Sequence, residues 1–311
     1  MTIERTRVIA QPKPWGVTEL RPWSATGNDG SLIGELSYQR SDESGPPPEL
    51  LLKHLFTNAP LSIQDHPDDA DAKTIELPNG RNEAWHVLSV APDAMICIGL
   101  KRLVKSQQLK PAIDDGSIVE LVHSRTVKAD DVVAVPAGTI HAIGSGIVLA
   151  DFQLRSSGTF RLLDHFHVRP LNFSDGVAVA HLGPCEPQRR PKRTTGQRRL
   201  LISNSNFVFE RIELEPGSRW RLDAERETWL LTLGGSGCSG SLKPVRGEAA
   251  FLKSEMIAVQ ADRMGANCLV AYVGSDGVVQ NLVLPIVSQV QAKLTAAATR
   301  KRTIMHPGVQ L

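Results

Sequence analysis

Four residues of this chain have the types and the spacing of a site for one divalent metal ion. Gln64 and His66 lie two residues apart in LSIQDHP, Glu83 begins the run EAWHVLSV, and His141 follows the turn PAG. Two imidazoles, one carboxylate and one amide oxygen can hold a divalent cation and leave a coordination position open. The pattern therefore predicts Lewis-acid chemistry on an oxygen-rich small molecule.

The expected strands would carry these side chains toward one place. Side chains alternate between the two faces of an extended chain, so Ser62, Gln64 and His66 share one face of their run. His86 lies on the opposite face from Glu83, and we do not count it as a ligand. All four candidate ligands fall on predicted strands that follow one another through turns. That combination predicts a metal site, although a single histidine near a strand end is more often a structural residue.

Several longer blocks resemble one protein family in order and in spacing. QDHPDD, GRNEAWHVL, VPAGTIHAIGSGIVLADFQ and GTFRLLDH resemble segments of the type I mannose-6-phosphate isomerases, above all the short bacterial form. The resemblance runs from about KPWG at 13–16 to about Val168, and more faintly to the C-terminus. It implies a cupin-superfamily isomerase that interconverts mannose 6-phosphate and fructose 6-phosphate. It also implies one zinc ion (Zn²⁺), or another divalent ion, on Gln64, His66, Glu83 and His141.

The resemblance also implies roles in an isomerisation that moves a proton through an enediolate. Arg161 in GTFRLL matches the family's active-site arginine, and Lys53 in LLLKHLF matches a lysine that faces the pocket. Asp151 stands where the family usually has a glutamate, and it shares one strand face with Gln153. The expected catalytic residues are Arg161, Asp151 and Lys53. The expected substrate contacts are Ser62, Lys53 and Gln153.

Length and composition limit the classes of protein and of partner. A chain of 311 residues with a net charge of +2 is long enough for about two domains and gives no global basic field for nucleic acid. The 4 cysteines show no CxxC spacing, which predicts free thiols in a reducing cytoplasm. We find neither an apolar signal region at the N-terminus nor an apolar run of the roughly 18 residues that cross a bilayer. We therefore expect a cytoplasmic monomer or homodimer that binds a hexose phosphate, and neither nucleic acid nor a membrane.

Short apolar runs between turn signals predict an all-β fold of two cupin-type jelly-roll sandwiches. Residues 1–185 would form the catalytic metal-binding domain. A short helical insertion is expected within it at about 104–126, where the apolar period changes to about 3.6. Residues 186–199 would form an exposed basic linker, because they are polar and rich in arginine and lysine.

The second half is expected to bind no metal. Residues 200–285 would form a second cupin-like domain, and no histidine lies between His181 and His306. Residues 286–311 would form a C-terminal tail that is helical over VSQVQAKLTAAATRK.

Two other functions fit part of the pattern. Two histidines and one carboxylate would also suit the ferrous ion of an oxygenase, which oxygen consumption and metal analysis would reveal. A non-catalytic cupin that binds a sugar phosphate would keep the fold and lose turnover. Damage to Asp151 or Arg161 would be its expected mark, and both residues are intact.

Overall fold

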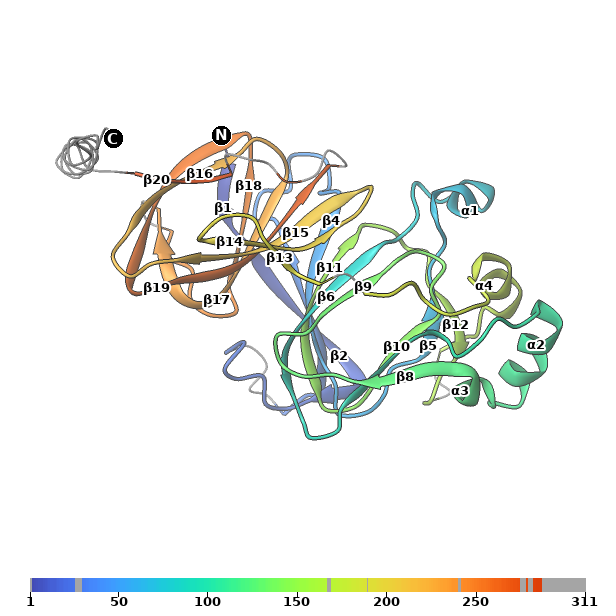
Figure 1. Ribbon diagram of the computed structural model, residues 1–311. Helices are drawn as coiled ribbons and strands as arrows, with labels where there is room; N and C mark the ends of the chain where they lie inside the picture. Colours follow the sequence, from blue (N-terminus) through green and yellow to red (C-terminus); the bar gives the residue numbers. More distant parts are fainter. Residues whose placement is uncertain are drawn as a thin grey trace, which may run out of the picture.

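The protein is mostly β-structure, with short helices gathered at one end of the molecule (Figure 1). The computed structural model describes residues 2–25, 30–166, 169–188, 190–239, 242–274, 278 and 282–286. No helix in these ranges is long and apolar enough to cross a membrane. The predicted helix over VSQVQAKLTAAATRK lies outside the described residues.

Two sheets face each other in the first half of the chain. The six-stranded sheet has the order β2 (Arg7–Val17), β3 (Ile33–Gln39), β4 (Leu50–Phe56), β11 (Ile147–Leu154), β6 (Glu83–Val90) and β9 (Val132–Val135). The five-stranded sheet has the order β12 (Phe160–Leu163), β5 (Ile63–Asp65), β10 (His141–Ile143), β7 (Met95–Leu100) and β8 (Val122–Thr126). The helices of this half are α1 (Asp69–Thr74), α2 (Ser106–Asp114), α3 (Ile118–Leu121) and α4 (Phe173–Val179).

The second half of the chain builds a nine-stranded sheet. Its main path is β1 (Thr2–Arg5), β18 (Ala249–Lys253), β17 (Thr228–Cys238), β19 (Glu255–Val273), β15 (Phe207–Leu214), β14 (Arg198–Ser203) and β13 (Lys192–Arg193). Off this path, β16 (Arg219–Ala224) pairs with β19, and β20 (Val283–Pro285) pairs with β16. Strand β1 joins this sheet by pairing with β18, although its residues lie at the start of the described chain.

The six-stranded sheet is buried on both of its faces. On one face Trp15, Trp85 and Ile96 belong to the core that it shares with the five-stranded sheet. On the other face Phe152 packs against Phe209 of the second half, with 4.9 Å between ring centroids. A strand covered on both faces reads as a near-continuous apolar run, which explains the sequence LLLKHLF of β4. The boundaries of the two predicted domains stay a prediction, because the two halves share a core.

The predicted helical insertion is shorter than expected. Two short helices break near Gly116, as predicted, and Gly116 has a positive φ of 79° that glycine adopts without strain. The last five residues of the predicted insertion, 122–126, form a strand instead of a helix. They pair with β7, and the β-branched Val122 lies opposite Leu100.

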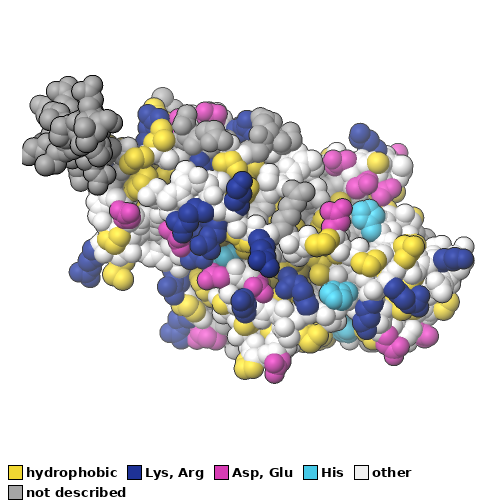
Figure 2. All heavy atoms as spheres, viewed as in Figure 1, with side chains coloured by type: hydrophobic (Ala, Val, Ile, Leu, Met, Phe, Trp, Pro, Cys, Tyr) yellow, Lys and Arg dark blue, Asp and Glu magenta, His cyan; other side chains and the backbone are white. Residues whose placement is uncertain are grey.

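The predicted linker at 186–199 also contains ordered structure. Both β13 and the start of β14 fall within it. Arg198 is 2% exposed and donates to Oε2 of Glu210 through Nε at 2.9 Å and Nη2 at 2.8 Å. The prediction of an exposed charge was wrong for Arg198, because a buried carboxylate neutralises it. Lys192, Arg193 and other cations of the segment are exposed. Figure 2 shows Lys and Arg side chains gathered near the middle of the face of the molecule that it displays.

Candidate metal centre and active site

Three of the predicted ligands converge between the two sheets of the first half. His66, Glu83 and His141 each offer one ligand atom, and these atoms lie within 4.8 Å of one another. Nε2 of His66 is 3.1 Å from Oε1 of Glu83, and Nε2 of His141 is 3.9 Å from Oε2. All three residues are buried. Three donor atoms of buried residues therefore surround one small volume.

Strand pairing explains why residues far apart in the sequence meet here. His141 on β10 lies opposite Gln64 on β5, and His66 follows directly after β5. Glu83 begins β6 on the facing sheet, where it lies opposite Gln153 of β11. The imidazoles thus come from one sheet and the carboxylate from the other. His86 points away from this group, as predicted, and its Nε2 lies 3.3 Å from Asp130.

Backbone carbonyls fix the tautomers of both histidines. Nδ1 of His66 lies 2.8 Å from the carbonyl oxygen of Gly158, and Nδ1 of His141 lies 2.8 Å from that of Thr139. A carbonyl can only accept, so each Nδ1 carries the proton and each Nε2 presents its lone pair. Burial lowers the pKa of His66 to about 4 and also lowers the pKa of His141. Both imidazoles are therefore neutral at neutral pH, as metal ligation requires.

The carboxylate of Glu83 is oriented by neighbouring donors. The indole Nε1 of Trp85 donates to Oε2 over 3.1 Å. With its amide nitrogen turned toward the carboxylates, Gln153 donates to Oε1 of Glu83 over 3.1 Å. Burial raises the pKa of Glu83, but the charged and hydrogen-bonding groups around it, including Arg81, hold it below the usual range. Glu83 therefore stays ionised.

Gln64 reaches the same group through its side-chain amide. Its Nε2 lies 3.4 Å from Nε2 of His141, and its Oε1 accepts a hydrogen bond of 3.1 Å from Ser62. Half a turn of the amide would place its oxygen toward Nε2 of His141. Two neutral imidazoles, an ionised carboxylate and a nearby amide fit a divalent ion.

The candidate metal centre borders a cavity of about 310 Å³. Its lining includes the predicted residues Lys53, Gln64, Glu83, Asp151, Gln153 and Arg161. It also includes Lys13, Trp15, Glu35, Arg81 and Arg169, which the sequence had not singled out. Ser62 is not among the residues that line it, and its hydroxyl donates to Oε1 of Gln64. Most of the predicted site residues are therefore brought to one cavity.

Asp151 lies on β11, between β4 and β6 of the six-stranded sheet. It is opposite Lys53 of β4 on one side and opposite Trp85 of β6 on the other. Gln153 donates to its Oδ2 over 2.7 Å. Burial, and then the nearby Glu83, raise the pKa of Asp151 above the usual range. The carboxyl group is held in place and lies at the cavity wall.

Arg161 enters the cavity from the facing sheet. It lies on β12 opposite Gln64, so it is the cross-strand neighbour of a predicted ligand. Its Nε finds no hydrogen-bond partner among the described residues. Burial and the neighbouring Arg169 lower the pKa of Arg161, although an arginine stays charged at neutral pH.

Arg81 is a site residue that the sequence reasoning missed. Its side chain is 8% exposed, its Nη1 donates to Oγ1 of Thr159 over 2.9 Å, and its Nη2 donates to the carbonyl of Ser156. The same Nη1 lies 4.0 Å from Oε1 of Glu83. Its position two residues before a predicted ligand, on the same face of an extended run, was the signal that could have identified it.

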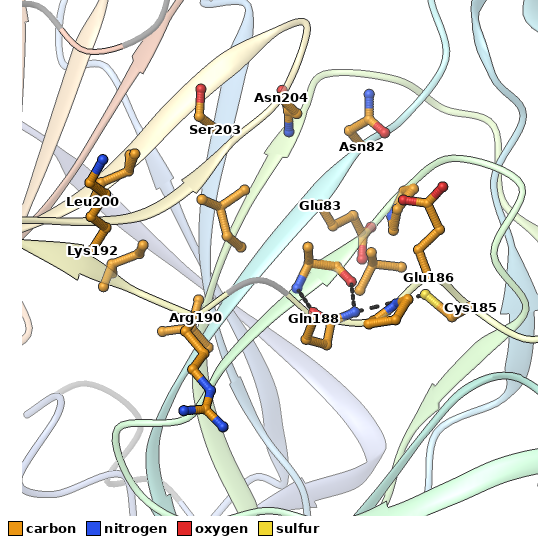
Figure 3. Close-up of a pocket in the computed structure, with 17 residues that line it drawn as sticks. Asn82, Glu83, Cys185, Glu186, Gln188, Arg190, Lys192, Leu200, Ser203 and Asn204 are labelled. Carbon is orange, nitrogen blue, oxygen red and sulfur yellow. Dashed lines mark hydrogen bonds between the residues drawn. The ribbon is translucent and has the colours of Figure 1, made fainter.

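A second cavity of about 460 Å³ lies between the edge strand β9, strand β14 and residues 185–188, 190 and 192 (Figure 3). Gln188 crosses part of it, accepting from the backbone nitrogen of Ala134 at 2.7 Å and donating to its carbonyl at 3.2 Å. This side chain satisfies backbone groups of an edge strand. Glu83 alone of the predicted site residues borders this cavity, so it is not the candidate active site.

The fold and the site together define a two-sandwich cupin with a candidate metal centre in its first sandwich. The sequence is 38% identical to mannose-6-phosphate isomerase ManA of Bacillus subtilis over 147 residues, 45% of this chain and 46% of the relative. It is 40% identical to mannose-6-phosphate isomerase of Streptococcus mutans over 115 residues, 37% of this chain and 36% of the relative. The chain thus matches less than half the length of these curated relatives. No protein-family model matches it.

Solved structures extend the similarity of fold to most of the chain. The mannose 6-phosphate isomerase from Bacillus subtilis has a TM-score of 0.74 at 18% identity, covering 88% of this chain and 100% of that one. A zinc-bound mannose 6-phosphate isomerase has a TM-score of 0.67 at 13% identity, with the same coverage. These similarities confirm the predicted fold class and the resemblance to the type I mannose-6-phosphate isomerases.

Proposed function

We propose that this chain is a metal-dependent aldose–ketose isomerase that interconverts mannose 6-phosphate and fructose 6-phosphate. The observation that carries the proposal is the buried group of His66, Glu83 and His141 beside a cavity that Asp151 and Arg161 line. Sequence similarity to curated mannose-6-phosphate isomerases over less than half of the chain supports the substrate.

We assign one zinc ion per chain to Gln64, His66, Glu83 and His141. The fixed tautomers and the neutral imidazoles support this assignment. A zinc-bound mannose 6-phosphate isomerase with the same fold supports zinc. When bound, the ion would polarise substrate oxygens and stabilise developing negative charge.

Asp151 is the residue we assign to proton transfer between C1 and C2. Its carboxylate would accept the proton from one carbon and return it to the other, through the enediolate. The 2.7 Å hydrogen bond from Gln153 holds the carboxylate in one orientation. Burial at 2% exposure keeps the proton from exchanging freely with bulk water. Lys53, the cross-strand neighbour of Asp151, is the alternative candidate for the base, and in that role it would not bind the phosphate.

Arg161 is assigned to the negative charge of the enediolate. A guanidinium fixed on a strand offers its donors without reorganisation during the reaction. The side chain of Arg161 lines the cavity, and its Nε has no hydrogen-bond partner among the described residues.

The remaining predicted contacts differ in how directly they reach the cavity. Lys53 and Gln153 line it and are assigned to substrate binding. Ser62 was expected to contact the substrate too, but its hydroxyl donates to the amide oxygen of Gln64.

We also propose a cytoplasmic location and a monomer or homodimer as the assembly. The four cysteines, Cys97, Cys185, Cys238 and Cys268, are free thiols. Free thiols are typical of a reducing compartment.

A coupled assay tests the proposal directly. Purified, zinc-loaded protein should convert mannose 6-phosphate to fructose 6-phosphate, and the mixture should reach the same composition from either side. Absence of conversion in zinc-loaded protein would contradict it. Oxygen consumption in the presence of ferrous ion would instead favour an oxygenase, which two histidines and a carboxylate also suit.

A further inference from the structure

Two lysines and one carboxylate form a chain of ion pairs at one end of the candidate-site cavity. Oε1 of Glu35 lies 3.2 Å from Nζ of Lys13, and Oε2 lies 3.4 Å from Nζ of Lys53. The side chains of Lys13, Lys53 and Glu35 are 30%, 23% and 14% exposed, and all three line the cavity. Each carboxylate oxygen of Glu35 therefore forms an ion pair with a different lysine, and this one carboxylate links the two ammonium groups.

A bulge in β2 aims Lys13 at this place. Pro12 and Val17 both lie opposite Ile33 of β3, so the residues between them form an extra loop in the strand. A bulge of this kind redirects side chains and is frequent beside active sites. Lys13 and Trp15, two residues of this bulge, both line the cavity.

Gly34 of β3 leaves the room that the bulge needs. A Cβ atom at position 34 would lie 2.5 Å from Cζ3 of Trp15 and 2.6 Å from Cβ of Lys13. These distances are below any ordinary carbon–carbon contact, so a larger residue would displace both side chains. The backbone nitrogen of Lys13 also donates to the carbonyl of Leu32 over 3.0 Å. Lys13 is therefore held at its base by the backbone and at its tip by Glu35.

The ion pairs lie away from the candidate metal centre, along the same sheet. Lys53 is on β4, Asp151 on the adjacent β11, and Glu83 on β6 beyond it. Adjacent strands are about 4.8 Å apart, so two spacings, about 10 Å, separate the backbones of Lys53 and Glu83. A hexose 6-phosphate carries its phosphate at the opposite end of the carbon chain from C1 and C2. The cavity thus has a cationic end and a metal-binding end for the two ends of such a molecule.

We propose that Lys13 is a second substrate-binding cation, which acts with Lys53 on the phosphate group, and that Glu35 is the positioning residue that sets the two ammonium groups. This inference rests on the proposed function. A lysine has three N–H donors, and the contact with Glu35 occupies one, so two remain on each lysine for phosphate oxygens. The carboxylate also offsets the repulsion between the two ammonium groups when no phosphate is bound.

The two roles lead to different kinetic effects. Lys13→Gln removes one charge-assisted contact with phosphate, so it should weaken binding of a non-isomerisable hexitol 6-phosphate about tenfold or more. The KM for mannose 6-phosphate should rise similarly, kcat should change less, and Lys13→Arg should restore most of the binding. Glu35→Gln removes the positioning group but adds net positive charge. It should lower kcat about tenfold or more by misplacing the substrate, without weakening binding of the hexitol phosphate.

Titration calorimetry on the zinc-loaded protein, together with the coupled assay, measures these effects. Glu19→Gln is the matched control, because it removes an exposed carboxylate that pairs with Arg21, 2.8 Å away, outside the cavity. Thermal melting shows whether each variant is folded, and Glu35→Asp serves if Glu35→Gln is not.

The outcomes separate this inference from the proposed function. If wild-type protein binds the hexitol phosphate in a Lys13-dependent way but does not isomerise, the isomerase proposal fails and the phosphate-binding role of Lys13 holds. If wild-type protein isomerises and folded Lys13→Gln has wild-type affinity and KM, the role of Lys13 is wrong. If a folded Glu35 variant has wild-type kcat, its positioning role is wrong. Absence of hexitol phosphate binding by the wild type would overturn both.

Discussion

Trp85 donates its indole N–H to the carboxylate of Glu83 over 3.1 Å, and the chain repeats this contact in its second half. There Nε1 of Trp229 lies 3.1 Å from Oε1 of Glu227, which again precedes it by two residues. Glu227, however, accepts from the backbone amides of Glu49 and Leu50 at 2.8 Å. The same contact between a glutamate and the tryptophan two residues later thus has two different surroundings. In the first half the glutamate faces two histidines, and in the second half it binds backbone amides of the first half.

The first prediction concerns the orientation of the Glu83 carboxylate. Trp85→Phe keeps most of the buried ring and removes the donor, so zinc affinity should fall about tenfold to a hundredfold. Competition with a zinc-binding dye measures it. Trp229→Phe is the control, because it removes the matching donor near Glu227 and should lower stability without changing zinc affinity. Unchanged zinc affinity in folded Trp85→Phe would show that the indole does not orient the ligand.

The second prediction concerns metal removal. Prolonged chelation should abolish isomerase activity and lower the melting temperature, and added zinc should restore both, because a ligand that binds only the folded state stabilises it. His66→Ala and His141→Ala should each lower zinc occupancy. His123→Ala is the control, since His123 is exposed on β8 and away from the candidate centre. Full activity in protein shown to be free of metal would rule the mechanism out.

The third prediction concerns stoichiometry. Elemental analysis of well-washed protein should find one metal per chain, because no histidine lies between His181 and His306. In the described part of the chain, the one group of three potential ligands is that of His66, Glu83 and His141. Two tightly bound ions would show that the second half contains a site of its own.

The sequence predicted the candidate ligands because local patterns carry them. The Gln-x-His pair, the strand that Glu83 begins and the turn before His141 are each complete within a few residues. The signal that separates the two short helices at Asp115–Gly116 was equally local. Alternation within one strand was also enough to place Asp151 and Gln153 on a common face.

The features that the sequence did not predict depend on pairing between distant strands. Glu35 meets Lys13 and Lys53 only through the register of β2, β3 and β4 and through the bulge after Pro12. Arg198 looked like one more charge in a basic segment, and only the fold places Glu210 beside it. Strand β1 pairs with β18 almost a whole chain away. The periodicity of a short stretch of sequence does not indicate which distant strand it will pair with, or in which register.

The fourth prediction concerns pH and the buried His54. Burial lowers its pKa to about 3, whereas an unfolded histidine titrates near 6.5. Between these values the unfolded state binds the proton and the folded state does not. The contribution of His54 to stability is therefore complete above about pH 6.5 and is lost as the pH falls toward 3, by about 1.4 kcal/mol per pH unit.

Urea unfolding of metal-free protein at several pH values between 4 and 7 measures this loss. Tyr38 donates its hydroxyl to the carbonyl of Gly247 over 2.5 Å, so it accepts from Nδ1 of His54, 3.0 Å away. His54→Gln keeps a donor toward Tyr38 and does not titrate, so its stability should fall less steeply on acidification. Parallel slopes for wild type and variant would mean that His54 is not the titrating group.

The last prediction separates binding from chemistry at Arg161 and Asp151. If Arg161 stabilises the enediolate, it acts more strongly in the transition state than in the ground state. Arg161→Ala should then lower kcat by about a hundredfold or more, with a smaller change in KM. Arg161→Lys should restore little, because a compact ammonium does not reproduce the planar guanidinium.

Asp151→Asn keeps the shape of the side chain and removes the proton acceptor, so it should spare zinc occupancy and lose turnover. Asp151→Glu restores a carboxylate that is one methylene longer, as is usual in the resembled family, and should retain more activity than the amide. Zinc occupancy, kcat and KM are measured on the same preparations. If Arg161→Ala and Asp151→Asn kept wild-type kcat and only raised KM, Arg161 would be an anchor for the substrate. Asp151 would then be structural, and Lys53, directly opposite it on β4, would be the next residue to test as the base.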